Sequence, residues 1–211
     1  MNALAALEPF LRAGRGIAPG QERCGVCTQV IDEEGHEHLV DVESRALLCA
    51  CPTCAITLAA PNNRTLRIVP RRVLFDPDFR LDEAQWAALA IPVRLAFVFY
   101  NSRLARWVAL YPSPGGAAEA ELPPGALDGL ATVTGLIAEI QPDVEALLVH
   151  GRRGGPLETL VAPIDACYRL VGEVRRHWRG FSGGDVVWRR IETFFAELRT
   201  RATPLEPEDR R

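Results

Sequence analysis

Hydrophobic and polar positions repeat with the helical period of about 3.6 residues in some segments and fit strands in others. Together these segments predict an α+β domain over residues 64–203. Apolar residues recur at helical spacing in four segments: 81–90, 126–140, 165–179 and 185–201. Runs rich in β-branched and aromatic residues predict strands. These runs occupy 66–70, 92–102, 105–113, 143–151 and 157–164.

The four longer strand-like runs pair along the sequence as two β-hairpins. One polar turn lies near Asn101, and the other is "RRGG" at 152–155. We therefore expect an antiparallel sheet covered by helices on one side. The segment "PSPGGAAEAELPPG" (112–125) is expected to be an exposed loop, and Ser182 or Asp185 to cap the last helix.

The chain outside this domain divides into three parts by its composition. Residues 1–20 predict a short amphipathic helix and a Gly/Pro-rich linker, and 204–211 predict a disordered tail. Residues 21–60 are polar and rich in turn formers, and they predict a separate small knuckle. Within it, "HLVDV" (38–42) and "RALLCA" (45–50) are short β-like runs that predict a small hairpin.

Composition and charge indicate an ordinary globular protein and argue against nucleic-acid binding and membrane insertion. Hydrophobic residues make up 48% and charged residues 24% of the 211, as in an ordinary globular protein. The net charge of −3 gives no electrostatic reason to expect nucleic acid or an acidic membrane as a partner. No apolar run reaches the ~18 residues that cross a bilayer, so we expect no membrane insertion. The first residues do not resemble a secretory signal, so a cytoplasmic location is expected.

Five of the six cysteines lie in the knuckle, and four of them form two Cys-x-x-Cys pairs. The pairs are Cys24/Cys27 in "CGVC" and Cys51/Cys54 in "CPTC". In a reducing cytosol such clusters bind metal more often than they form disulfides. Two tight turns supply four thiolates, the tetrahedral ligand set of a structural Zn²⁺. The binding energy of the ion would replace a hydrophobic core that about 40 residues cannot build alone.

A single iron in the same four-cysteine site is the alternative to zinc, because the two pairs also resemble the loops of rubredoxins. A rubredoxin loop is usually followed directly by glycine, whereas this chain has Thr28 and Ala55 at those positions. Residues 20–60 also lack Phe, Tyr and Trp, so rubredoxin's aromatic packing is missing. The spacing differs from that of the common ferredoxin runs as well.

Three further residues lie close to the pairs in the sequence. Cys49 and Cys51 point to the same face of an extended strand, so Cys49 is expected beside the site. It is a fifth ligand, a reactive thiol or a small buried side chain, and the last is favoured. His36 and His38 alternate along a strand, and we expect that they cannot both face the metal. The simpler interpretation of "EEGHEH" is a solvated turn with one histidine near the site.

The cysteine block "RCGVC…HEHLVDVESRALLCACPTCAITL" and four later blocks together resemble one bacterial family of unknown function. The later blocks are "YPSPGGA", "QPDVEALLV", "VAPIDACYRLVGEVRRHWRGFSGG" and "VWRRIETFFAELR". Members of this family are encoded beside nickel–iron hydrogenase structural and maturation genes. The resemblance, over about 20–202, implies an accessory protein for hydrogenase assembly or electron flow, with a hydrogenase-related protein partner. It marks Cys24, Cys27, Cys49, Cys51 and Cys54 as a metal-like motif, and Asp165, Cys167 and Tyr168 as a second motif.

The second motif raises the question of catalysis. Cys167 near a helix N-terminus is a candidate nucleophile with a lowered pKa, and His150 or His177 is a possible base. The favoured interpretation is that Asp165 caps the helix while Cys167 and Tyr168 pack.

Three functional hypotheses follow. The first is a non-enzymatic accessory protein with a zinc-stabilised docking module. The second is an electron-transfer adaptor with an iron–thiolate centre. The third is a cysteine-dependent enzyme, or a metal chaperone that uses Cys49 as a transfer ligand.

Overall fold

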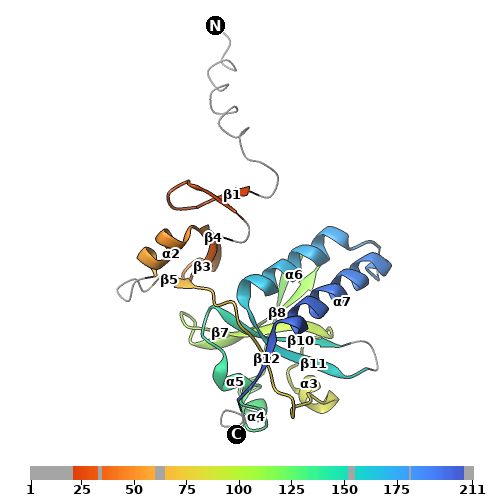
Figure 1. Cartoon of the computed structure of the whole chain (residues 1–211). Coiled ribbons are helices and arrows are strands. Elements are labelled where there is room, and N and C mark those ends of the chain that lie inside the picture. The colour runs from red at the N-terminus through yellow and green to blue at the C-terminus, as the bar shows by residue number, and fades with distance from the viewer. Residues whose placement is uncertain (1–20, 33–34, 60–64, 152–154, 181, 207–211) are drawn as a thin grey trace. The chain divides into compact units, whose positions relative to one another are not determined.

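The computed structural model describes residues 21–32, 35–59, 65–151, 155–180 and 182–206 (Figure 1). The chain forms two compact units, Met1–Ile68 (unit 1) and Val69–Arg211 (unit 2). Three predicted features lie outside the described residues: the helix and linker over 1–20, the turn at 152–154 and the last residues, 207–211, of the predicted tail.

The described residues of unit 1 form two small sheets and one short helix. The first sheet pairs β1 (Gln21–Arg23) with β2 (Val30–Asp32). The second has the order β4-β3-β5, and the predicted hairpin 38–50 is confirmed as its first pair. Its strands are β3 (Glu37–Asp41), β4 (Ala46–Ala50) and β5 (Leu66–Ile68). The predicted strand at 66–70 thus joins the small sheet through antiparallel pairing with β3.

Helix α2 (Pro52–Leu58) follows β4 directly and was not predicted. Cys51 occupies its N-cap in an extended conformation, and Pro52 stands at the first helical position. Proline fits there because its fixed φ suits the helix and its missing N–H would have no partner within the helix. The "CPTC" segment is therefore the beginning of a helix.

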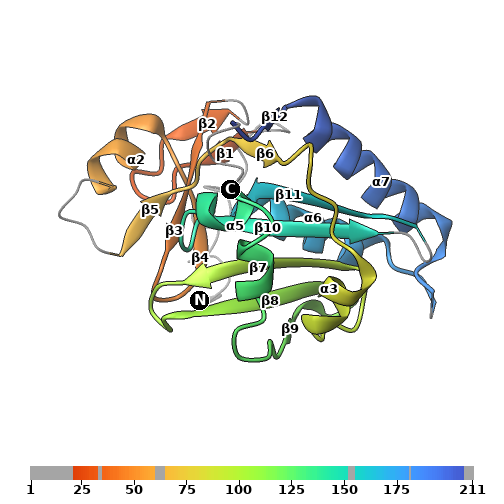
Figure 2. The ribbon, with the colours of Figure 1, turned by 90° about the horizontal axis from the view of Figure 1, so that it is seen from below.

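Unit 2 is built on a seven-stranded sheet with the order β12-β6-β11-β10-β7-β8-β9 (Figure 2). The two predicted hairpins are confirmed as β7 (Leu95–Asn101) with β8 (Arg106–Ser113), and β10 (Glu145–Gly151) with β11 (Leu157–Pro163). Antiparallel pairing of β10 with β7 joins them. The edge strand β12 (Ala202–Pro204) and its neighbour β6 (Val73–Phe75) were not predicted, and they form a parallel pair.

Helices cover both faces of this sheet, whereas cover on one side was expected. The long helices α6 (Ile164–His177) and α7 (Gly184–Thr200) pack on one face (Figures 1 and 2). The other face packs into a core with short helices, because Trp86, Leu130 and Leu136 bury there with strand residues such as Val98 and Leu147. These short helices are α3 (Glu83–Ala88), α4 (Asp128–Ala131) and α5 (Leu136–Glu139).

Three local predictions in unit 2 were wrong, each for a physical reason. The expected loop 112–125 contains strand β9 (Gly116–Ala120), which pairs with β8 despite its weak β propensity. The expected helix 126–140 is two short helices, separated where the Thr134 hydroxyl donates to Asp76 Oδ2 at 2.7 Å. The cap of α7 is Gly183, with φ 84°, because a Cβ there would lie 2.8 Å from Val187 Cγ1.

A buried ion pair fastens the beginning of unit 2 to its sheet. Arg72 donates from Nε and Nη2 to the two oxygens of Glu145, at 2.7 and 2.9 Å, and Glu145 is fully buried. The Gln141 N–H also donates to Glu145. A buried carboxylate needs such partners, so this pair is a structural element of the fold.

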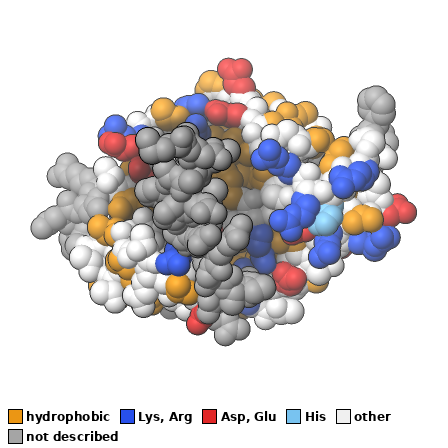
Figure 3. All heavy atoms as spheres, turned by 90° about the horizontal axis from the view of Figure 1, so that it is seen from above, with side chains coloured by type: hydrophobic (Ala, Val, Ile, Leu, Met, Phe, Trp, Pro, Cys, Tyr) orange, Lys and Arg blue, Asp and Glu red, His pale blue; other side chains and the backbone are white. Residues whose placement is uncertain are grey.

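The surface of unit 2 carries its charge unevenly. Exposed arginines line α6, α7 and the segment between them: Arg175, Arg176, Arg179, Arg189 and Arg190. Figure 3 shows arginine side chains gathered beside a histidine on this side of the molecule. Among the helices that the structure describes, none combines the length and the apolar character that a bilayer span requires.

Candidate metal centre

The first cysteine pair lies in the tight turn between β1 and β2. The Cys24 N–H donates to Gln29 O at 2.8 Å, and the Thr28 N–H donates back to Cys24 O at 2.9 Å. These bonds fold the chain so that Cys24 and Cys27 lie on the same side of the turn. Thr28 has φ 63°, the left-handed conformation for which glycine is normally used. The turn thus keeps the shape that a glycine would give it, although the residue is threonine.

The second pair lies at the start of α2. The Cys51 sulfur accepts a hydrogen bond from the Cys54 N–H at 3.5 Å, as the side-chain oxygen of an N-cap serine would. Cys51 and Cys54 are thus the N-cap and third residues of one helical turn, which places both sulfurs at the same end of the helix. Sequence spacing alone predicted a turn here and missed the helix that continues it.

The structure brings these two turns together. The sulfurs of Cys24, Cys27, Cys51 and Cys54 all lie within 4.8 Å of one another, and Cys27 Sγ is 3.8 Å from Cys51 Sγ. Sulfurs bound tetrahedrally to Zn²⁺ at about 2.3 Å lie about 3.8 Å apart. No disulfide joins any of the six cysteines, all of which are described. The Gly25 N–H donates to Cys49 O at 2.8 Å, which ties the first turn to the strand that carries the second.

Two of the four sulfurs have pKa values that are shifted in opposite directions. Burial alone would raise the pKa of Cys24, but the backbone N–H groups of Cys27, Cys51 and Val26 lower this pKa to about 6. The neighbouring sulfurs of Cys51 and Cys27, together with burial, raise the pKa of Cys54 to about 12. Cys24 therefore favours the thiolate, and Cys54 favours the thiol unless a cation neutralises the added charge.

His36, His38 and Cys49 form a second group of metal-type ligands. One ligand atom from each lies within 4.8 Å of the others, and His36 Nε2 is 3.1 Å from His38 Nε2. Neither histidine belongs to the four-sulfur group. The reason expected for this, alternation along a strand, is wrong, because residues two apart in extended backbone share a face. Residues 33–34 of the expected solvated turn lie outside the described residues. Cys49 belongs to this second group and not to the four-sulfur group.

The Asp165, Cys167 and Tyr168 motif serves packing. Helix α6 begins at Ile164 with Pro163 as its N-cap, so the expected cap at Asp165 is wrong. Cys167 is fully buried, and Tyr168 packs edge-on against Phe97. Burial, followed by the charge of Asp165, raises the pKa of the Cys167 thiol, whereas a nucleophile needs it lowered. The favoured packing interpretation of Cys167 and Tyr168 is confirmed.

The candidate bases for Cys167 are engaged elsewhere. His150 stacks on Phe195 at 4.4 Å between ring centroids, and its Nε2 lies 4.0 Å from Glu192. His177 lies 3.4 Å from Glu173, one helical turn earlier. Neither contact pairs a histidine with the Cys167 sulfur.

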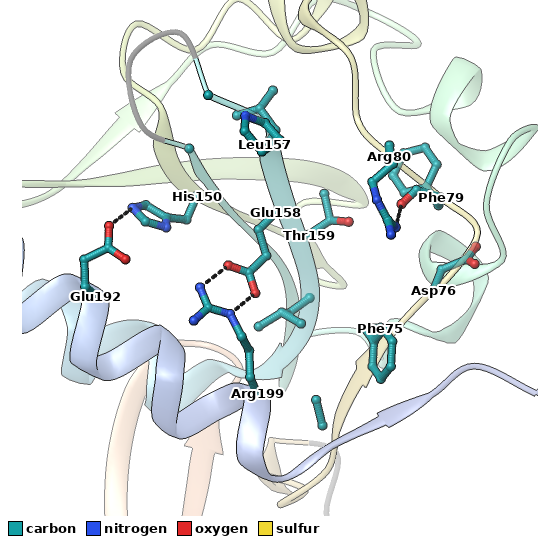
Figure 4. A pocket seen from close by; sticks show the side chains of 15 residues that line it. Phe75, Asp76, Phe79, Arg80, His150, Leu157, Glu158, Thr159, Glu192 and Arg199 are labelled. Atoms are coloured by element: carbon teal, nitrogen blue, oxygen red, sulfur yellow. Dashed lines mark hydrogen bonds and ion pairs between the residues drawn. The ribbon is translucent and has the colours of Figure 1, made fainter.

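Unit 2 also contains a cavity of about 570 Å³ between β6, β11 and α7, which no motif in the sequence predicted (Figure 4). Two pairs of its polar side chains meet: Arg199 donates to both oxygens of Glu158 at 2.6 and 2.7 Å, and His150 faces Glu192. Asp76 Oδ2 accepts from the Thr134 hydroxyl. Arg80 donates to the Phe79 carbonyl at 2.6 Å. Paired charges and apolar walls suit a small organic molecule, but they do not converge on a reacting atom. The four-sulfur group is the stronger candidate site.

Comparison with known proteins gives one match. The sequence model of a family of unknown function, DUF5947, matches residues 23–202, a range that includes all six cysteines. No curated protein and no solved structure matches the chain.

Proposed function

The chain belongs to DUF5947, a family of unknown function, and we propose that it is a non-enzymatic, metal-binding accessory protein. Cys24, Cys27, Cys51 and Cys54 bind one Zn²⁺, and the ion holds unit 1 together as a docking module for a protein partner. The observation that carries this proposal is the convergence of four sulfurs, from two turns 23 residues apart, within 4.8 Å.

Zinc is preferred to iron because of how the two turns differ. One is a turn between strands, and the other is the first turn of a helix. The two cysteine pairs therefore do not form the two similar loops of a rubredoxin. A closed tetrahedral set of four thiolates is the common form of a structural zinc site. Its role is to join elements that have little core of their own.

Docking is supported by apolar side chains that the module exposes. Val26, between the two cysteines of the first turn, is 44% exposed, and Ile56 on α2 is 72% exposed. An ion on the four sulfurs fixes both elements that carry them. The hydrogenase-related identity of the partner comes from the sequence resemblance alone.

Metal analysis of anaerobically purified protein tests the site directly. We expect colourless protein that contains zinc, and a Cys24→Ser variant that has lost the tightly held ion. Red protein that dithionite bleaches would identify an iron–thiolate centre instead, and it would replace the docking module by an electron-transfer adaptor.

Docking has its own experiment. Ile56→Ser and Val26→Ser should weaken association with co-produced hydrogenase-related proteins and leave the zinc content unchanged. Val186→Ser is the matched control, since Val186 is 48% exposed but lies on α7 of unit 2. Equal association by all three variants would exclude the exposed apolar surface of unit 1 as the docking site.

A further inference from the structure

We propose that His36, His38 and Cys49 form a second metal site in unit 1, which binds an exchangeable divalent ion of the Zn²⁺ class through two imidazoles and one thiolate. The site is distinct from the four-sulfur centre, and it depends on the proposed function only in that unit 1 must be folded.

The backbone places the three side chains on one face. His38 and Cys49 are direct partners across the antiparallel pair β3/β4. Side chains of such partners lie on the same face, with Cβ atoms about 5 Å apart. His36 lies directly before β3, and its Nε2 is 3.1 Å from His38 Nε2, which brings its ring to the same side. The register of β3 on β4 therefore brings His38 and Cys49 together, and the residues that precede β3 add His36.

Hydrogen bonding prepares His36 as a ligand. Its Nδ1 lies 3.1 Å from the carbonyl oxygen of Asp32, and a carbonyl only accepts, so Nδ1 carries the proton. The lone pair is then on Nε2, the atom that faces His38. Histidines that bind metals typically donate their other ring N–H to a backbone carbonyl or carboxylate in this way.

The ring separation also fits a shared ion. Two nitrogens bound tetrahedrally to Zn²⁺ at about 2.05 Å lie about 3.3 Å apart. The two Nε2 atoms are 3.1 Å apart, and the rings meet edge to face at 77°. The Cys49 sulfur lies within 4.8 Å of both, so a small inward movement completes a three-ligand set. His38 and Cys49 are each partly buried, so the set remains accessible from solvent.

Three protein ligands give this site a different chemistry from the first. Four thiolates close the coordination sphere of Zn²⁺, whereas two imidazoles and one thiolate leave one position open to water or to a donor from another molecule. An ion with an open position can be passed on by ligand exchange without unfolding the module. The site thus suits delivery or sensing of an ion, and the four-sulfur centre suits structure.

Zinc titration of the full chain tests the proposal. Protein is first equilibrated with a chelator of moderate strength, so that only the tight ion remains, and Zn²⁺ is then added. We expect one further ion per chain, bound more weakly. Removing one of three ligands, in His38→Gln or Cys49→Ser, should weaken this second step by more than the roughly 10- to 100-fold that loss of an outer partner costs.

Site-resolved alkylation gives a second measurement. The added Zn²⁺ should protect Cys49 from iodoacetamide in the wild type and not in His36→Gln or His38→Gln. His177→Gln is the matched control, because His177 is in unit 2 beside Glu173, and it should behave as wild type.

Two results would overturn the second site: a wild-type chain that takes up no further ion, or a Cys49→Ser variant that keeps the second step. Failure of the four-sulfur proposal looks different. In that case the tight first step is absent from the wild type and from Cys49→Ser alike.

Discussion

The two units of this chain are held together by different means. Among the described residues of unit 1, the buried cluster consists of six side chains, and two of these, Ile31 and Leu39, are large aliphatics. The other four are Cys24, Ala50, Cys51 and Ala55. One face of the sheet in unit 2 alone buries nineteen. Each large aliphatic contributes about 1.5 to 3 kcal/mol, whereas ordering each residue costs about 1 to 2 kcal/mol. Unit 1 therefore needs another source of stability, and unit 2 does not.

The contrast shows how one chain can combine a metal-dependent and a metal-independent part. Two of the six side chains in the small cluster are themselves proposed metal ligands, so loss of the ion would remove the centre of that cluster. Substitutions in unit 1 should consequently change its metal-dependent folding, whereas substitutions in unit 2 should change the free energy of unfolding of unit 2.

The largest expected effect is the loss of one sulfur from unit 1. Cys24→Ser should remove most of the ion's contribution to folding, which is on the order of 10 kcal/mol for structural zinc. We expect limited proteolysis to degrade residues before about 69 and to leave a stable fragment of unit 2. A variant with the wild-type cleavage pattern would show that the ion is not needed for folding.

Removing a large side chain from the core of unit 2 should have a smaller effect than loss of a sulfur from unit 1. It should change the stability of unit 2 and leave the metal content unchanged. Leu148 on β10 is fully buried, so Leu148→Ala should lower the free energy of unfolding of unit 2 by about 3 to 5 kcal/mol. Chemical denaturation followed by the fluorescence of the tryptophans, all of which lie in unit 2, measures this. The zinc content should stay at the wild-type value, and its loss would mean that the units do not respond separately.

The buried ion pair of unit 2 gives the next effect. Glu145→Gln removes one of the two carboxylate charges beside Arg72, since Glu139 Oε2 lies 3.2 Å from Arg72 Nη1. The loss should be about 3 kcal/mol, near the lower end for broken buried pairs, because Arg72 is about one-third exposed and keeps Glu139. The same denaturation experiment measures the loss. A change below about 1 kcal/mol would show that solvent screens this pair as it screens surface pairs.

The smallest effect concerns the first metal turn. Thr28 adopts a left-handed conformation that is unfavourable for its side chain, so Thr28→Gly should stabilise zinc-loaded unit 1 by about 1 kcal/mol. Resistance of unit 1 to proteolysis measures it. Ala105→Gly is the matched control, since Ala105 has φ 49° in an exposed turn of unit 2 and should stabilise only that unit. A destabilising Thr28→Gly would mean that the threonine hydroxyl, which donates to Cys27 O at 2.6 Å, contributes more than the strain.

Local sequence features predicted the elements that local chemistry determines. The hairpins β7/β8 and β10/β11 and the two long helices follow from periodicity, and the α+β class follows from their order. The four cysteines were found because two-residue spacing is itself the chemical requirement for a shared ion.

The features that were missed depend on contacts between distant residues. Strand β9, with the sequence GAAEA, has weak β propensity and forms only because β8 offers an edge. The three-residue strand β12 forms only by pairing with β6, about 130 residues earlier, and β6 in turn pairs with β11. The grouping of His36, His38 and Cys49 required the register of β3 on β4, together with a correct use of the two-residue period.

Hydrogen exchange of the full chain, with and without a strong chelator, tests most directly whether an ion holds unit 1 and a hydrophobic core holds unit 2. Chelation should release the amides of β3, β4 and α2 to fast exchange and leave those of β7, β10 and β11 protected. Unchanged protection of β3, β4 and α2 after the ion is removed would contradict the account.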